Sequence, residues 1–93
     1  MSSSDIKAKR VTSTGSLSVG PARIRGLHVL VGGGAGRLTV TDGSGGETVL
    51  DLDFAQSDTD SVTIPDYGIR CASDGGIHIA TLTNITALTV FYS

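Results

Sequence analysis

The sequence is poor in cysteine and in aromatic residues: among 93 residues there are one cysteine and no tryptophan. A single cysteine cannot form an intramolecular disulfide, so the fold depends on its core or on association between copies. Aromatic residues make up 4% of the chain, and no basic patch is interleaved with them. Because rings and basic patches are what nucleic acids bind, we expect no nucleic acid as a partner.

Long apolar runs are also missing. The most apolar stretch, residues 27–31, ends at three glycines, whereas a membrane-spanning helix needs roughly 18 apolar residues or more. The first ten residues, MSSSDIKAKR, lack the apolar region of a secretory signal. We therefore expect a protein made in the cytoplasm with no membrane as a partner, and a single thiol suits that reducing compartment.

Residues that favour helices are scarce, with one glutamate and two lysines. Threonine, valine and isoleucine together occupy 26 positions, and their β-branched side chains disfavour helices and suit pleated sheets. No segment repeats apolar residues at the spacing of an amphipathic helix. The composition therefore predicts a small all-β protein.

Turn residues divide the chain into about eight strand-length segments, spaced by the roughly 8–12 residues typical of sandwiches and barrels. The expected strands are residues 6–14, 22–31, 37–41, 47–54, 61–65, 68–73, 76–83 and 87–92. Glycine-rich segments 32–36, 42–46 and 74–76 predict hairpins, and residues 84–86 predict the last hairpin. Residues 55–60 predict a crossover between sheets. We expect one compact antiparallel β-sandwich, jelly-roll-like, over residues 6–93, after a flexible N-terminal arm of residues 1–5.

The second expected strand changes phase at Gly26. Ile24 lies between two arginines, but the next apolar residues that alternate are Leu27, Val29 and Val31. A period of two cannot change parity without an extra residue. The sequence therefore predicts a β-bulge at Gly26, which would bend this strand around the core.

Motifs for phosphate and metal binding are incomplete. No Gly-Lys pair is present, so there is no Walker loop, and hairpin turns explain the glycine-rich segments better. His28 and His78 are far apart in the sequence, and Cys71 has no second cysteine at ligand spacing. Paired aspartates such as Asp51 and Asp53 could hold a weakly bound Ca²⁺, although a solvated strand face is the simpler interpretation. We expect no metal and no cofactor.

Catalytic residues lack a recognisable arrangement as well. Ser44 lies directly between two glycines, whereas a nucleophile elbow needs its glycines two residues away on each side. Cys71 falls on the apolar phase of its strand, which indicates a small core residue. A sandwich of this size also offers little room for a substrate pocket. We expect a protein that is not an enzyme, with no catalytic residues.

Charge is distributed unevenly along the chain. Six basic residues stand against one acidic residue up to position 40, and one basic residue stands against eight acidic ones after it. Either these charges mix on a solvated surface once the strands interleave, or they form opposite faces through which copies or a larger partner meet. The candidate partner-contact residues are Lys7, Lys9, Arg10, Arg23 and Arg25.

The order of the segments resembles a known group of proteins. The relevant stretches are IKAKRVT from residue 6, RIRGL from 23, GGAGRLTVTDG from 33, TVLDLDF from 48, IPDYGI from 64 and ATLTNITALTVFY from 80. Together they resemble the small all-β structural proteins of marine tailed bacteriophages, especially cyanophages. The resemblance covers most of the chain after its first residues. It implies a virion component made in many copies, and it supplies no site residues.

Within a virion, the resemblance favours a capsid cement or decoration protein that binds neighbouring capsid subunits. Its partners would be the major capsid protein or other virion proteins, and it would form a homo-oligomer, with a trimer favoured. The charges between Lys7 and Arg10 would belong to an arm that meets an acidic capsid surface, or else to an ordinary edge strand. A tail or connector component is an alternative. A small carbohydrate-binding module is another, although an aromatic platform for sugars is not evident.

Overall fold

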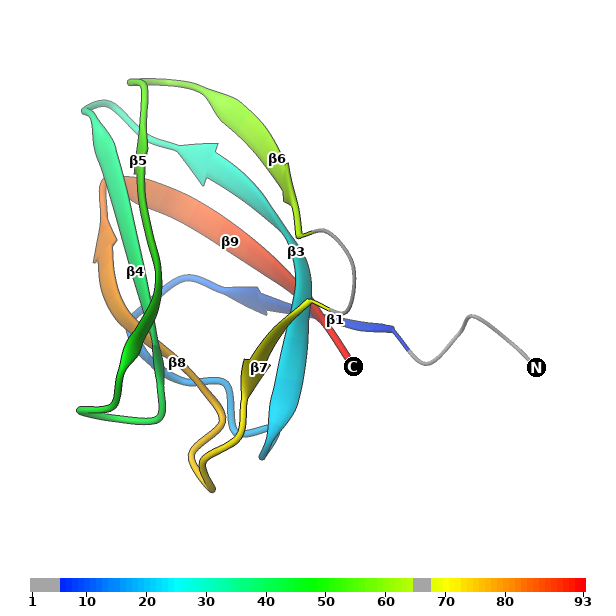
Figure 1. The fold of residues 1–93 in the computed structure, drawn as a ribbon. Helices are drawn as coiled ribbons and strands as arrows, with labels where there is room; N and C mark the ends of the chain where they lie inside the picture. The colour runs from blue at the N-terminus through cyan, green and yellow to red at the C-terminus, as the bar shows by residue number, and fades with distance from the viewer. Residues whose placement is uncertain (1–5, 65–67) are drawn as a thin grey trace.

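The computed structural model describes residues 6–64 and 68–93, which form nine strands and no helix (Figure 1). The all-β prediction is confirmed. The strands are β1 (Lys7–Val11), β2 (Gly15–Ser16), β3 (Ala22–Val31), β4 (Gly36–Asp42), β5 (Thr48–Phe54), β6 (Thr59–Thr63), β7 (Ile69–Cys71), β8 (Ile77–Thr83) and β9 (Ile85–Tyr92). The predicted arm of residues 1–5 and the last residue of the predicted strand 61–65 lie outside the described residues.

The strands form two antiparallel sheets that face each other. Sheet A has the order β1-β9-β3-β6, with β7 also paired to β3, and sheet B has the order β2-β8-β4-β5. Figure 1 shows the two layers with β4, β5 and β8 on one side and β3, β6 and β9 on the other. The predicted antiparallel two-sheet architecture is therefore present.

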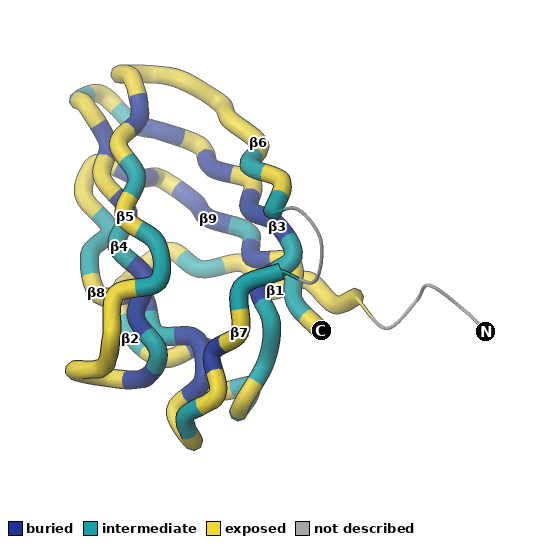
Figure 2. Tube along the Cα trace, viewed as in Figure 1, coloured by how far each residue is buried: buried dark blue, intermediate teal, exposed yellow. Residues whose placement is uncertain are grey.

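The core lies between the inner faces of the two sheets. Leu38 and Val40 of β4 point inward from sheet B, and Leu88 and Val90 of β9 point inward from sheet A, as their alternation predicts. All four side chains are fully buried, and Figure 2 shows the buried positions alternating along these strands. Burying apolar side chains on one face of each sheet is what holds the two layers together.

The turn predictions are correct for one hairpin and wrong for the others. Residues 42–46 connect β4 to β5, which pair with each other in sheet B. By contrast, residues 32–36, 74–76 and 84–86 each lead from one sheet to the other, so the strands on either side of them are not hairpin partners. A turn signal marks where the chain reverses or bends, but it does not specify in which sheet the chain continues.

The predicted crossover at residues 55–60 does pass from sheet B to sheet A, although β6 begins at Thr59, within that segment. The predicted first strand, residues 6–14, is shorter in the structure. β1 ends at Val11, and after a bend the chain forms the short β2 in the other sheet. The sequence did not indicate β2, because two residues are too few to show a period.

The phase change in β3 coincides with a register shift. Ile24 is opposite Tyr92 of β9, whereas Gly26 is opposite Phe91, so Arg25 is an extra residue on β3. Beyond this point Leu27, rather than Gly26, takes the core-facing position. The irregularity keeps both halves of β3 facing the core, as a bulge does.

Candidate functional site

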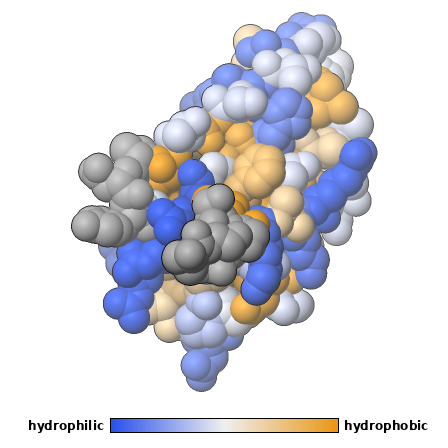
Figure 3. All heavy atoms as spheres, turned by 90° about the vertical axis from the view of Figure 1, so that its right-hand side faces the viewer, coloured by the Kyte–Doolittle hydropathy of each residue, from blue (hydrophilic) through white to orange (hydrophobic). Residues whose placement is uncertain are grey.

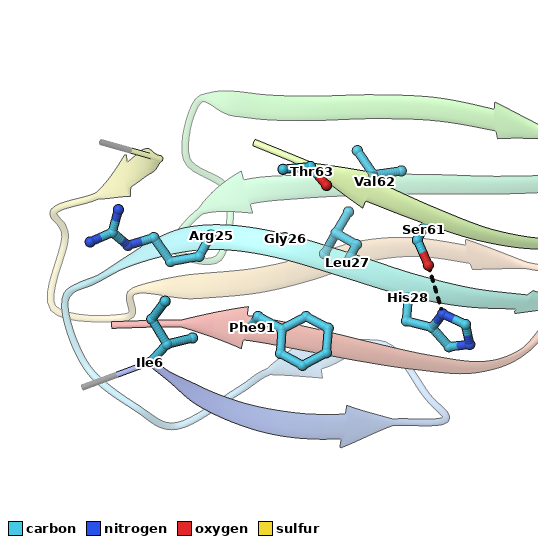
Figure 4. A pocket seen from close by; sticks show the side chains of 9 residues that line it. All are labelled: Ile6, Arg25, Gly26, Leu27, His28, Ser61, Val62, Thr63 and Phe91. Carbon is cyan, nitrogen blue, oxygen red and sulfur yellow. Dashed lines mark hydrogen bonds between the residues drawn. The ribbon is translucent and has the colours of Figure 1, made fainter. Parts of the chain in front are cut away.

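An open groove of about 460 Å³ crosses the outer face of sheet A (Figure 4). Its lining comes from β3, β6 and β9, together with the residue just before β1. The outward-facing lining residues are Ile6, Arg25, His28, Ser61, Thr63 and Phe91.

Gly26 produces the depression. It lies between Thr63 of β6 and Phe91 of β9, at a position where any other residue would project a side chain outward. A Cβ atom at this position would stand 3.1 Å from the carbonyl oxygen of Val62 and 3.8 Å from Cδ2 of Phe91. The glycine therefore lets the backbone itself form the floor of the groove.

Apolar side chains border the groove. Ile6 is 48% exposed and Phe91 is 37% exposed, and Leu30, 40% exposed, lies further along the same face of β3. Figure 3 shows apolar side chains among strongly hydrophilic ones on this side of the molecule. Large exposed apolar side chains that gather on one face are typical of a surface that contacts a partner.

His28 and Ser61 form a polar pair at one end of the groove. They are opposite residues of β3 and β6, and His28 Nδ1 lies 3.0 Å from Ser61 Oγ (Figure 4). A hydrolytic triad needs a carboxylate on the second imidazole nitrogen. Among the described residues no carboxylate is bonded to His28. The pair offers hydrogen-bonding groups to a ligand and does not resemble a catalytic triad.

Arg25 lies at the other end of the groove, and Arg23 lies two residues before it on β3. The Arg25 Nε atom donates a hydrogen bond to Ser93 Oγ at 2.9 Å. Arg23 lies directly opposite Arg70 of β7, so two positive charges share one cross-strand position next to a polar depression of about 330 Å³. Like charges opposite each other in a sheet repel. Arg23 and Arg70 therefore place two guanidinium groups side by side at this end of sheet A.

The remaining predicted contact residues do not act as one group. Lys7, Lys9 and Arg10 lie in β1, paired with β9 at the margin of sheet A. Of the two alternatives that the sequence leaves open for these residues, a basic arm or an ordinary edge strand, the structure shows the edge strand. Lys9 is opposite the core-facing Val90 and its Nζ donates to the carbonyl oxygen of Leu17 at 2.6 Å, whereas Arg10 is on the outer face. The alternation of a strand separates charges that are adjacent in sequence.

The described residues contain no group of three or more histidine, cysteine or acidic side chains that could hold a metal ion. Asp51, one candidate for calcium, is bonded to Arg37 at 2.9 Å, and this bond holds the pKa of Asp51 below its ordinary value. Cys71 is fully buried, and burial raises the pKa of its thiol to about 11. A thiol that is protonated at neutral pH is a poor nucleophile.

Within the part of the chain that the structure describes, no helix is long and apolar enough to cross a membrane. Comparisons with protein-family models, with curated proteins and with solved structures gave no match. The geometry of sheet A is therefore the basis for any functional conclusion.

Sequence reasoning missed most of the groove. Phe91 could have been found, because Leu88, Val90 and Tyr92 share one phase and leave Phe91 on the other face. Ser61 and Ile6 could not be predicted as groove residues, because their proximity to the groove depends on which strands are neighbours. Gly26 was singled out for its backbone, and the structure gives it a second consequence, the groove floor.

Proposed function

We propose that the protein is a non-enzymatic structural component of a bacteriophage virion, namely a capsid cement or decoration protein that binds neighbouring capsid subunits. The observation that carries the proposal is the groove on the outer face of sheet A, with Phe91 and Ile6 at its border and Arg25 at one end. An apolar depression with a charged rim suits protein–protein contact.

We further propose that the fold is a jelly roll. The pairs β1·β9, β2·β8, β3·β6 and β4·β5 lie alternately in sheet A and sheet B. A long antiparallel hairpin rolled into two sheets would give this set of pairs, and β7 is an addition to it. Jelly rolls occur in viral capsid proteins and in lectins, so this topology is compatible with the proposed role without establishing it.

The proposed partner is the major capsid protein or another virion protein, and the proposed location is the virion, with synthesis in the host cytoplasm. Arg25 and Arg23 would contact acidic groups of the capsid surface, while an apolar side chain of the capsid would occupy the groove above Gly26. Oppositely charged surfaces steer such an encounter, and the buried apolar contact provides most of the affinity. We propose that the decorating unit is a homo-oligomer, with a trimer favoured.

Phe91 also supports a second candidate, a carbohydrate-binding module. An exposed ring with hydroxyl, imidazole and guanidinium groups beside it, here those of Ser61, His28 and Arg25, offers both stacking and hydrogen bonding to a sugar. The tail or connector role would use the same outer face against a different virion protein. These candidates differ in the ligand that the groove binds.

The test is attachment to particles that lack the protein. We expect the wild-type protein to bind purified heads, and Phe91→Ala to reduce the bound copies at least tenfold. Thr81→Ala, on the outer face of sheet B and opposite Thr39, is the matched control and should bind normally. Circular dichroism confirms that each variant is folded. Equal binding by wild type and Phe91→Ala would overturn the proposal, and binding to tails or to a glycan array instead of heads would support the corresponding alternative.

A further inference from the structure

We propose that sheet A continues from one copy of the protein into the next, with β1 of one copy pairing antiparallel with β6 of its neighbour. β1 and β6 are the two end strands in the order β1-β9-β3-β6 (Figure 1). Among residues 6–64 and 68–93, each pairs with a strand on one side only, so each presents a row of backbone donors and acceptors at the margin of the sheet. Pairing of such margins is a common mode of association.

The strand directions allow this continuation without a change of pattern. β1 is antiparallel to β9, β9 to β3, and β3 to β6. β6 therefore runs opposite to β1 within one copy. When a second copy stands beside the first in the same orientation, its β1 meets β6 of the first copy antiparallel, and the sheet remains antiparallel throughout. The interface is heterologous, so it closes into a ring or grows into a longer assembly, depending on the rotation between copies.

The two margins carry opposite charge. Residues 6–11 contain three basic side chains and no acidic one, whereas residues 55–64 contain two acidic side chains and no basic one. The basic side chains belong to Lys7, Lys9 and Arg10, and the acidic ones to Asp58 and Asp60. Both strands are exposed along nearly their whole length. Two β1 margins would repel each other, as would two β6 margins, which favours the head-to-tail arrangement.

The side-chain phases of the two strands also match. Lys9 lies opposite the core-facing Val90, and Asp60 lies opposite the core-facing Val29. In a continuous sheet, residues that are directly opposite share a face, so Lys9 and Asp60 can stand opposite each other. In that register Ala8 meets Ser61, and Arg10 meets Thr59, which are outer-face residues in their own copies. No apolar side chain is turned to the wrong face.

This pairing uses the margins of sheet A, whereas the proposed capsid contact uses its face. The edge pairing and the capsid contact can therefore be tested independently, because the protein can lose one and keep the other. A protein that associates in solution but does not attach to particles would retain the edge pairing, and one that attaches as a monomer would retain only the docking face.

The experiment compares charge reversals in the full chain by sedimentation velocity over a range of concentrations. We expect wild type to self-associate and Asp60→Lys to weaken association about tenfold at low salt, because an attractive pair is replaced by repulsion. Asp74→Lys makes the same charge change in the β7–β8 connection and should associate like wild type. Higher ionic strength should reduce the difference.

The reciprocal change tests the partner edge. Lys9→Asp should weaken association similarly, and the double variant K9D/D60K should recover it, because the pair is restored with opposite polarity. Thermal unfolding identifies any loss of folding from the Lys9–Leu17 bond, and Asp60→Lys is informative on its own if that loss occurs. A monomeric wild type, a silent Asp60→Lys, or a folded double variant without recovery would overturn the proposal.

Discussion

Gly26 and Phe91 stand directly opposite each other in β3 and β9, and the ring of Phe91 lies 3.8 Å from the point where a Cβ atom on Gly26 would stand. This pair of residues links the register shift of β3 to the groove on the outer face of sheet A. Next to the register shift, the strand has to bring its backbone close to β6 and still leave its inner face in phase with the core. Glycine, which has no side chain, meets both requirements and leaves a depression beside the exposed ring of Phe91.

We predict that Gly26→Val lowers the free energy of unfolding by about 1–3 kcal/mol. A Cβ atom at residue 26 already stands 3.1 Å from the Val62 carbonyl oxygen, and the two methyl groups of valine add bulk to this contact. Gly33→Val is the matched control, because nothing lies within 4 Å of a Cβ atom there and its φ is not positive. Urea denaturation measures both. Equal stability of the two variants would contradict the close approach seen at Gly26.

Asp42 should make stability depend on acid pH. The Ser73 N–H donates to Asp42 Oδ1 at 3.0 Å, and this bond holds the pKa of Asp42 below its ordinary value of 3.8. A carboxyl group whose pKa is lower in the folded state stabilises the fold above its ordinary pKa, and the contribution is lost as pH falls below it. We predict that the melting temperature of Asp42→Asn falls less between pH 5 and pH 3 than that of wild type. Parallel curves for the two proteins would show that the Ser73 bond has no such effect.

Much of sheet formation could be predicted from the sequence because alternation is a local property. Leu38 and Val40, or Leu88 and Val90, reveal an inner face whatever the neighbouring strand is. Alternation does not reveal which sheet the strand joins, so the sequence predicts hairpins at residues 32–36 and 84–86, where the chain passes between the sheets. Sheet membership depends on packing between distant segments, which turn residues do not encode.

The candidate site was less predictable for a related reason. The sequence leaves Lys7 and Lys9 either in a basic arm or in an edge strand, because an edge strand needs little apolar alternation. Their pairing with Tyr92 and Val90 appears only in the register with β9. The outer-face position of Phe91 can be predicted from the alternation along its strand. The approach of Ser61 to His28 cannot, because it depends on β3 and β6 being neighbours.

Cys71 should be unreactive in the native protein. It is fully buried, and its pKa is raised to about 11, first by burial and then by the charge of Asp42. We predict that Ellman's reagent labels it slowly at pH 8 and rapidly in urea. Because the folded-state pKa is above the ordinary value of 9.0, the thiol also makes the fold less stable as pH rises from about 9 to about 11. Cys71→Ala should lack that alkaline component, and rapid native labelling would contradict the burial.

The last prediction concerns Lys9, whose ammonium group connects β1 of sheet A to the segment that follows β2. Its Nζ donates to the carbonyl oxygen of Leu17, a buried residue in the segment between β2 and β3. Lys9→Met keeps the length of the side chain and removes the donor, so we expect the free energy of unfolding to fall by about 1 kcal/mol. Lys7→Met removes the same charge from the same face of β1 and should have a smaller effect.

Both variants are measured by urea denaturation at low protein concentration, where association between copies contributes least to apparent stability. Deleting residues 1–9 should destabilise the protein more than Lys9→Met, because the deletion also removes three of the five residues of β1 and their pairing with Tyr92, Phe91 and Val90. If the truncated protein unfolds at the same urea concentration as wild type, residues 7–9 do not contribute to sheet A. Equal effects of Lys9→Met and Lys7→Met would instead mean that the loss comes from the charge and not from the bond to Leu17.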